Sequence, residues 1–78
     1  MGQQLTLSNL AAQAQAVLAQ SPVHALRNLR VRWDGDELVL AGRVCSFYHK
    51  QLAQEVIRAV ARGARVRNTI EVAYEPYE

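Results

Sequence analysis

Cysteine and histidine are scarce in this sequence, which has one of the first and two of the second among 78 residues. A lone cysteine, Cys45, cannot form a disulfide within the chain, and so few thiols and imidazoles cannot build a structural zinc site. Cys45 and His49 lie close in sequence, but nucleophilic catalysis also needs a third group that orients the base, and none is placed near them. We therefore expect no metal, no cofactor and no enzymatic activity.

Long apolar runs are missing as well. No stretch of the sequence approaches the ~20 apolar residues that are needed to span a bilayer. The first residues, Met1 to Leu5, lack the charged start and the apolar run of a secretory signal. These absences favour a cytoplasmic protein, either free or peripheral at the inner membrane.

The chain is short, which limits the core that it can bury. A single core in a chain below ~80 residues rarely yields more than roughly 3–5 kcal/mol of net stability, and small proteins often add self-association to it. We predict one domain over residues 8–74, with a disordered or frayed N-terminus at 1–7 and a C-terminal tail at 75–78. A homo-oligomer is an open alternative to a monomer.

The spacing of apolar residues predicts two helices and three strands. In order, they are helix 8–20, strand 29–33, strand 37–44, helix 46–61 and strand 65–74. Ser8 and Ser46 are expected N-caps, and Pro22 ends the first helix because the residue before proline is pushed out of the helical region. Asp34-Gly35 is the strongest short signal for a tight hairpin turn between the first two strands.

This order predicts an α+β fold, a two-layer sandwich with a three-stranded mixed sheet. The segment 38–41 is apolar on both faces, which places its strand at the centre. A right-handed crossover through the second helix sets the last strand parallel to the central one, and both helices cover one face. The strand residues expected to face the helices are Leu29, Val31, Trp33, Leu38, Leu40, Val44, Val66, Ile70 and Val72.

Four residues are expected to have structural roles. Gly35 makes the hairpin turn and Ser46 caps the second helix. Gly42 lies on the inward face, where a side chain would collide with a closely packed helix. Asn68 is a polar residue at an inward position, and we expect it to satisfy backbone groups near the end of the sheet.

The opposite face of the sheet is expected to be open and basic. Eight of the nine basic residues are arginines, which suit bidentate contacts with phosphate or carboxylate. Alternation places on this face Arg30, Arg32, Val39, Ala41, Arg43, Arg65, Arg67, Thr69 and Glu71. We predict that the five arginines bind an anionic surface around the apolar pair Val39 and Ala41. The alternative is a solvated face that only keeps the protein soluble.

The segment from Leu40 to Ser46 reads Leu-x-Gly-x-Val-x-Ser and resembles the centre of a BON domain, a bacterial family. The other matching positions are Trp33-Asp34-Gly35, Lys50, Ala53 and Val66-x-Asn68-x-Ile70-x-Val72. The resemblance covers about residues 10–73, although the connection through Arg62-Gly63-Ala64 is shorter than the family usually has. It implies a non-catalytic binding module, often associated with phospholipid or envelope surfaces.

Two other functions compete with docking on an anionic phospholipid or acidic protein surface. Self-assembly as a structural protein would use apolar residues as interfaces, and the candidates are Val39, Ala41, Phe47, Tyr48, Tyr74 and Tyr77. RNA binding of the KH type is more remote, because the sequence lacks the Gly-x-x-Gly loop that clamps the RNA backbone. We therefore do not expect nucleic acid as a partner.

Overall fold

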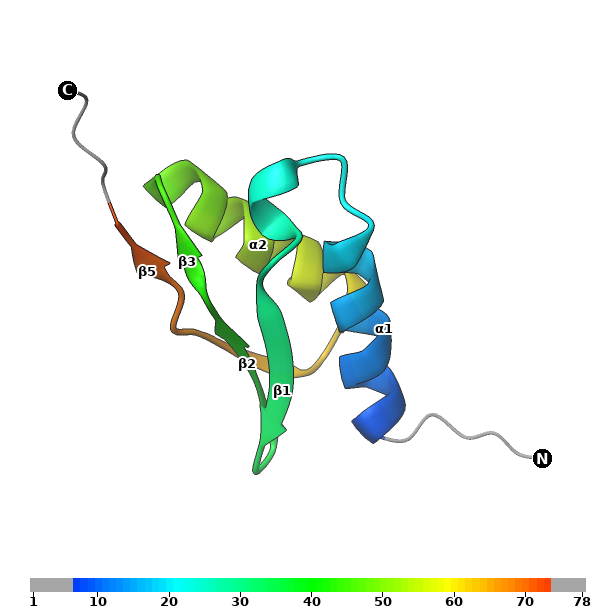
Figure 1. The fold of residues 1–78 in the computed structure, drawn as a ribbon. Helices are drawn as coiled ribbons and strands as arrows, with labels where there is room; N and C mark the ends of the chain where they lie inside the picture. The colour runs from blue at the N-terminus through cyan, green and yellow to red at the C-terminus, as the bar shows by residue number, and fades with distance from the viewer. Residues whose placement is uncertain (1–6, 74–78) are drawn as a thin grey trace, which may run out of the picture.

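The structure, a computed structural model, describes residues 7–73 (Figure 1). Its elements in order are α1 (Leu7–Ala19), the 3-10 helix η1 (His24–Leu26), β1 (Arg30–Asp34), β2 (Glu37–Ala41), β3 (Arg43–Val44), α2 (Phe47–Val60), β4 (Arg65–Asn68) and β5 (Glu71–Val72). The predictions for Tyr74, Tyr77 and the chain ends at 1–6 and 75–78 lie outside the described residues.

The two helices form where the sequence favours them, with one difference at the start of α1. Ser46 is the N-cap of α2, and its hydroxyl oxygen accepts a hydrogen bond from the His49 backbone N–H at 3.2 Å. This confirms the predicted cap, which satisfies one of the free N–H groups at a helix start. α1 begins at Leu7, so Ser8 lies inside the helix and is not its N-cap as predicted.

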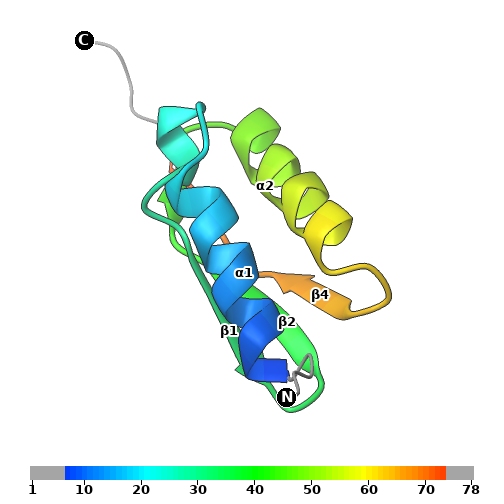
Figure 2. The ribbon, with the colours of Figure 1, turned by 90° about the vertical axis from the view of Figure 1, so that its right-hand side faces the viewer.

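The strands pair as the sequence predicts. β1 and β2 are antiparallel around the turn at Gly35, whose φ of 64° is readily adopted by glycine. β4 lies parallel to β2 on its other side, which gives the sheet order β1-β2-β4. Figure 2 shows α1 and α2 side by side over the same face of this sheet. The result is the predicted α+β sandwich.

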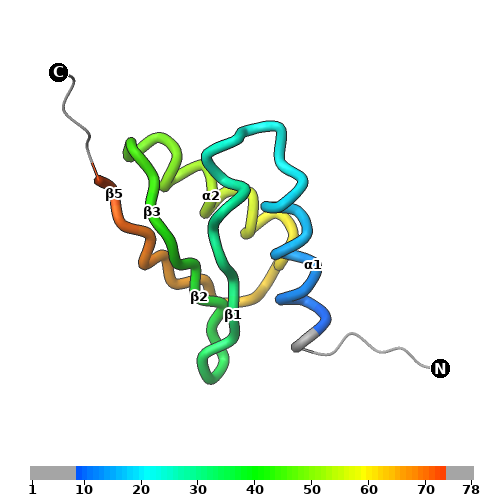
Figure 3. Tube along the Cα trace, viewed as in Figure 1, coloured from blue at the N-terminus to red at the C-terminus, as the bar shows by residue number. Residues whose placement is uncertain are grey.

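The predicted long strands 37–44 and 65–74 are each interrupted at the same level. β2 stops at Ala41 and resumes as β3, while β4 stops at Asn68 and resumes as β5, and the trace in Figure 3 shows β3 and β5 running together beyond β1. The parallel register is unchanged across the interruption, because Leu40 pairs with Asn68 and Arg43 pairs with Glu71.

Gly42 sits at this interruption, and its role differs from the predicted one. It is exposed, its φ is 136°, and a Cβ atom built on it would lie 2.6 Å from Leu29 Cδ2 and 3.4 Å from Leu29 Cα. A side chain at Gly42 would therefore collide with Leu29, which directly precedes β1, and not with a helix as predicted. Both the backbone angle and the approach of Leu29 require glycine here.

The core lies between the helices and the inward face of the sheet. All nine predicted strand residues belong to this core or pack against it. From α1 and α2, the fully buried residues are Ala14, Leu18, Ala53 and Ile57. Val17 of α1 is 37% exposed, because it lies at the margin of the apolar stripe.

Two polar side chains connect the helix layer to the sheet. The Gln15 amide on α1 donates to the Leu29 carbonyl at 2.8 Å, and its oxygen accepts from the Val31 N–H at 2.9 Å. Asn68 donates to the Lys50 carbonyl at 3.0 Å and to Gln54 Oε1 at 3.2 Å, and it accepts from the Ile70 N–H at 3.1 Å. Asn68 thus satisfies backbone groups on both layers.

Candidate functional site

The candidate site is the face of the sheet away from the helices, here called the arginine face. The strand register brings Arg30 and Arg32 on β1 to the same side as Arg65 and Arg67 on β4. All four are exposed, as is Arg43 beyond the interruption. The structure therefore places the five predicted arginines on one face, because each occupies an outward position of the alternation.

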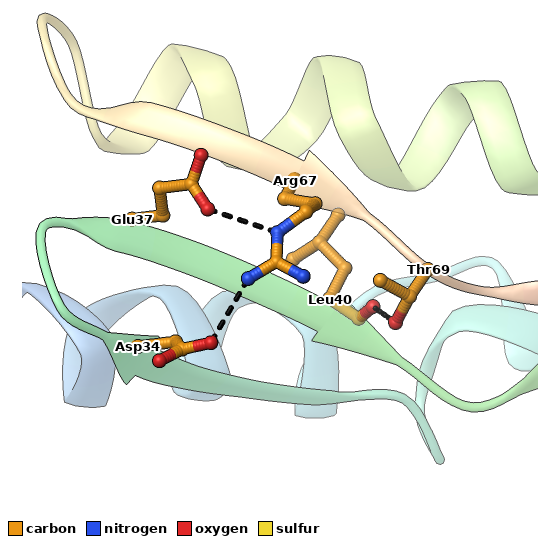
Figure 4. Close-up of polar contacts among 5 residues, drawn as sticks. All are labelled: Asp34, Glu37, Leu40, Arg67 and Thr69. Carbon is orange, nitrogen blue, oxygen red and sulfur yellow. Dashed lines mark hydrogen bonds and ion pairs between the residues drawn. The ribbon is translucent and has the colours of Figure 1, made fainter.

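Arg67 is bound by two carboxylates of the same face (Figure 4). Its Nε donates to Glu37 Oε1 at 2.9 Å, and one of its terminal nitrogens donates to Asp34 Oδ2 at 2.9 Å. The hydrogen bond to Glu37, followed by the one to Asp34, raises the pKa of Arg67 above its ordinary value. Arg67 therefore joins strands of the sheet, and a ligand would have to compete with Glu37 and Asp34 for its guanidinium group.

The five arginines differ in how far neighbouring carboxylates neutralise them. Arg43 lies 3.6 Å from Glu71 across β3 and β5, with both side chains about 69% exposed, so this pair is weak. Arg30, Arg32 and Arg65 have no carboxylate within ion-pair distance among residues 7–73. These three carry the charge that an anionic partner would meet first.

The apolar patch predicted at Val39 and Ala41 is not a free surface. Val39 is only 2% exposed although it lies outside the helix-facing core. Its neighbours in register are Arg32 and Arg67, whose long aliphatic stems can cover apolar surface while the charged ends stay in water. Ala41 is half-buried. The prediction of an exposed Val39 was therefore wrong, and the face is more polar than expected.

The exposed apolar side chains lie elsewhere, at the start of α2. Phe47 is 62% exposed and Tyr48 is 67% exposed, and the Tyr48 ring lies 5.4 Å from the His49 ring between centroids. Cys45, just before the cap, is also exposed. His49 Nδ1 lies 3.0 Å from Ser46 Oγ, so the imidazole partners the capping serine.

Residues 7–73 contain neither a metal-binding cluster nor a membrane-spanning helix. Residues 7–73 bring together no group of three histidine, cysteine, aspartate or glutamate side chains that could hold a metal ion. No helix in this range is long and apolar enough to cross a membrane.

The sequence interpretation missed Asp34 and Glu37 as members of the arginine face. It assigned Asp34 to the hairpin turn and began the second strand at Glu37 without placing that residue on the face, whereas Asp34 ends β1, Glu37 opens β2, and the two residues pair across the ladder. Extending the alternation from Arg30 and Arg32 by one more step would have placed Asp34 beside them.

Comparison with known proteins identifies the domain type. The chain matches the BON domain over residues 6–74, which is nearly its whole length. No curated protein matches it.

Proposed function

The chain belongs to the BON domain family, and on this basis we propose that it docks on anionic phospholipid head groups through its arginine face. BON domains are non-catalytic binding modules, and phospholipid binding is the role suggested for the family. The alternative partner is an acidic protein surface, whose carboxylates arginine can bind in the same bidentate way as phosphate.

The observation that carries this proposal is the unneutralised charge of Arg30, Arg32 and Arg65 on one face. A basic residue near an anionic membrane contributes about 1 kcal/mol before screening, so three give roughly 3 kcal/mol at most. Asp34, Glu37 and Glu71 on the same face lower the net attraction. Such a surface supports weak, reversible and salt-sensitive binding.

Charge reversal at two exposed arginines tests the proposal. Arg30→Glu with Arg32→Glu should lower co-sedimentation with vesicles of phosphatidylglycerol and phosphatidylcholine by about tenfold or more, since two favourable charges become repulsive. The matched control is Arg58→Glu with Arg62→Glu, which makes the same change in net charge away from the arginine face.

The control double variant should keep most of the binding, and vesicles of phosphatidylcholine alone should bind none of the proteins. Equal losses in both double variants would show that only net charge matters. If the unaltered protein fails to bind the anionic vesicles at low salt, phospholipid is not its partner.

Self-association is a second candidate function, favoured by the exposed pair Phe47 and Tyr48 at the start of α2. Such aromatic side chains commonly anchor protein interfaces. The molar mass from light scattering behind size exclusion, at two salt concentrations, tests it. A discrete oligomer that Phe47→Ser with Tyr48→Ser dissociates would support this function, whereas a monomer at high micromolar concentration excludes it.

A further inference from the structure

The two edges of the sheet are treated differently by the fold. On β1, the Gln15 side chain donates to the outward-facing carbonyl of Leu29 and accepts from the outward-facing N–H of Val31. On β4, the Thr69 N–H donates to the Leu40 carbonyl of β2, and Leu40 pairs with Asn68. In a parallel ladder this geometry turns the N–H and C=O of Val66 and Asn68 away from β2, toward the outer edge.

These outward groups of β4 have no hydrogen-bond partner within residues 7–73. The edge is closed only at its end, where the Asn68 side chain accepts from the Ile70 N–H. An unpaired edge is a template on which another extended chain can form backbone hydrogen bonds. The free stretch of β4 presents two donors and two acceptors for this purpose.

A wall of α2 side chains stands beside this edge. A groove of about 300 Å³ runs along one side of α2 and reaches the sheet at Asn68. A second groove continues it to Ala64, Arg65 and Val66, and the two share Gln54 and Arg58. An extended segment added to β4 would thus lie in a preformed channel between the strand edge and the helix.

The positive charge of this channel favours an acidic segment as the added strand. Lys50, Arg58 and Arg65 line it, and none of the three is in an ion pair within the described chain. Of the two lining carboxylates, Glu37 is already bound by Arg67, and Glu55 is bonded to Gln51. Cations without partners therefore outnumber anions along the channel.

The same charges disfavour a second copy of this chain as the occupant. A two-fold pairing of β4 with β4 of another copy would set Arg67 opposite its own equivalent and would place the two α2 walls of like charge together. Like charges directly opposite in paired strands are destabilising. A segment rich in carboxylates meets no such repulsion.

We propose that the outer edge of β4 binds an extended, acidic segment of a partner protein by strand addition. Its backbone bonds to Val66 and Asn68, and carboxylates at alternate positions face Lys50 and Arg58 on the helix side. This site shares Arg65 with the arginine face but is tested separately from the proposed phospholipid function, because Arg30 and Arg32 lie on the opposite edge strand, β1.

Amide NMR of the full chain titrated with synthetic peptides tests the proposal. The probes are an eight-residue peptide alternating glutamate and valine, its lysine and valine counterpart, and the glutamate peptide N-methylated at alternate amides. The glutamate peptide should shift the amide signals of Val66 and Asn68 most. We expect the lysine and N-methylated peptides to bind at least about tenfold more weakly.

Val66→Pro removes the outward N–H of Val66, and Val66→Ala is its matched control, because both lose the side chain but only proline loses the donor. Binding of the glutamate peptide should fall about tenfold in Val66→Pro and stay within about twofold in Val66→Ala. If Val66→Pro does not fold, two tests remain on folded protein. The N-methylated peptide tests the backbone hydrogen bonds, and Arg58→Glu, which should weaken binding of the glutamate peptide, tests the charge of the channel.

Strand addition is overturned if the glutamate peptide shifts Arg30 and Arg32 instead, or if the N-methylated peptide binds equally well. Absence of any shift at millimolar peptide overturns it as well. The vesicle experiment has independent outcomes, since its test variant, Arg30→Glu with Arg32→Glu, leaves β4 and α2 unchanged.

Discussion

Arg67 and Asp34 meet across the whole width of the three-stranded sheet, 2.9 Å apart, although they belong to its opposite edge strands. β2 lies between them and contributes Glu37 to the same guanidinium group at 2.9 Å. One side chain thereby ties all three strands together on the solvent side, where no helix covers the sheet.

Replacing Arg67 by alanine should lower the free energy of unfolding by a small but measurable amount. The loss is small because both ion pairs are substantially exposed, so solvent screens them. Urea denaturation of Arg67→Ala measures it, and Arg65→Ala, which breaks no ion pair, should stay within about 0.5 kcal/mol of the parent. Equal effects of the two variants would contradict the assigned role.

Gln15→Leu should destabilise the protein by about 1–3 kcal/mol, because the Val31 N–H and the Leu29 carbonyl lose their partner. The Val31 amide should also exchange with deuterium faster. Gln13→Leu is the control, since Gln13 lies on the same helix and is exposed to solvent. Unchanged exchange at Val31 in Gln15→Leu would show that the contact does not persist in solution.

Gly42→Ala should cost more stability than Gly35→Ala. At Gly42 the added Cβ would meet Leu29 and the φ of 136° is unfavourable for alanine, whereas at Gly35 no atom lies within 4 Å. Backbone strain of this kind costs about 1–3 kcal/mol, and the contact with Leu29 adds to it. Thermal unfolding of the two variants gives the comparison, and a smaller loss for Gly42→Ala would refute the assigned constraint.

Amide exchange along β4 should alternate in the free protein. The Thr69 and Glu71 N–H groups donate to β2 and to Gly42 at 2.9 Å, so their exchange should be slow. The Val66 and Asn68 N–H groups face outward with no hydrogen-bond partner in the described range 7–73, and they should exchange at least about tenfold faster, because only hydrogen-bonded amides are strongly protected. Uniform protection over these four residues would mean that the edge is already paired in solution.

Local patterns were enough to predict most of the fold. The alternation from Leu29 to Trp33, the Asp34-Gly35 turn and the capping Ser46 each depend on neighbours in sequence, and each is found in the structure. The doubly apolar segment 38–41 correctly predicted the central strand. These features were predictable because the period of a strand and the chemistry of a cap are short-range properties.

The contacts that shape the candidate site could not be predicted in the same way. Gln15 reads as an ordinary polar helix residue until α1 is placed against β1, and the contact spans 16 residues to Val31. The burial of Val39 depends on side chains from two other strands. The approach of Leu29 to Gly42 depends on where β1 begins relative to β2. Each needs the three-dimensional arrangement before it can be recognised.

The unchanged register across the strand interruption fixes the number of residues between paired positions of the parallel strands. Glu37 pairs with Arg65 and Arg43 pairs with Glu71, 28 residues further along the chain in both cases. One residue inserted within α2 would rotate the following part of its apolar side by about 100° away from the sheet. Changes in chain length between the parallel strands are therefore expected in the connections that flank α2, such as Arg62-Gly63-Ala64, and not within the helix.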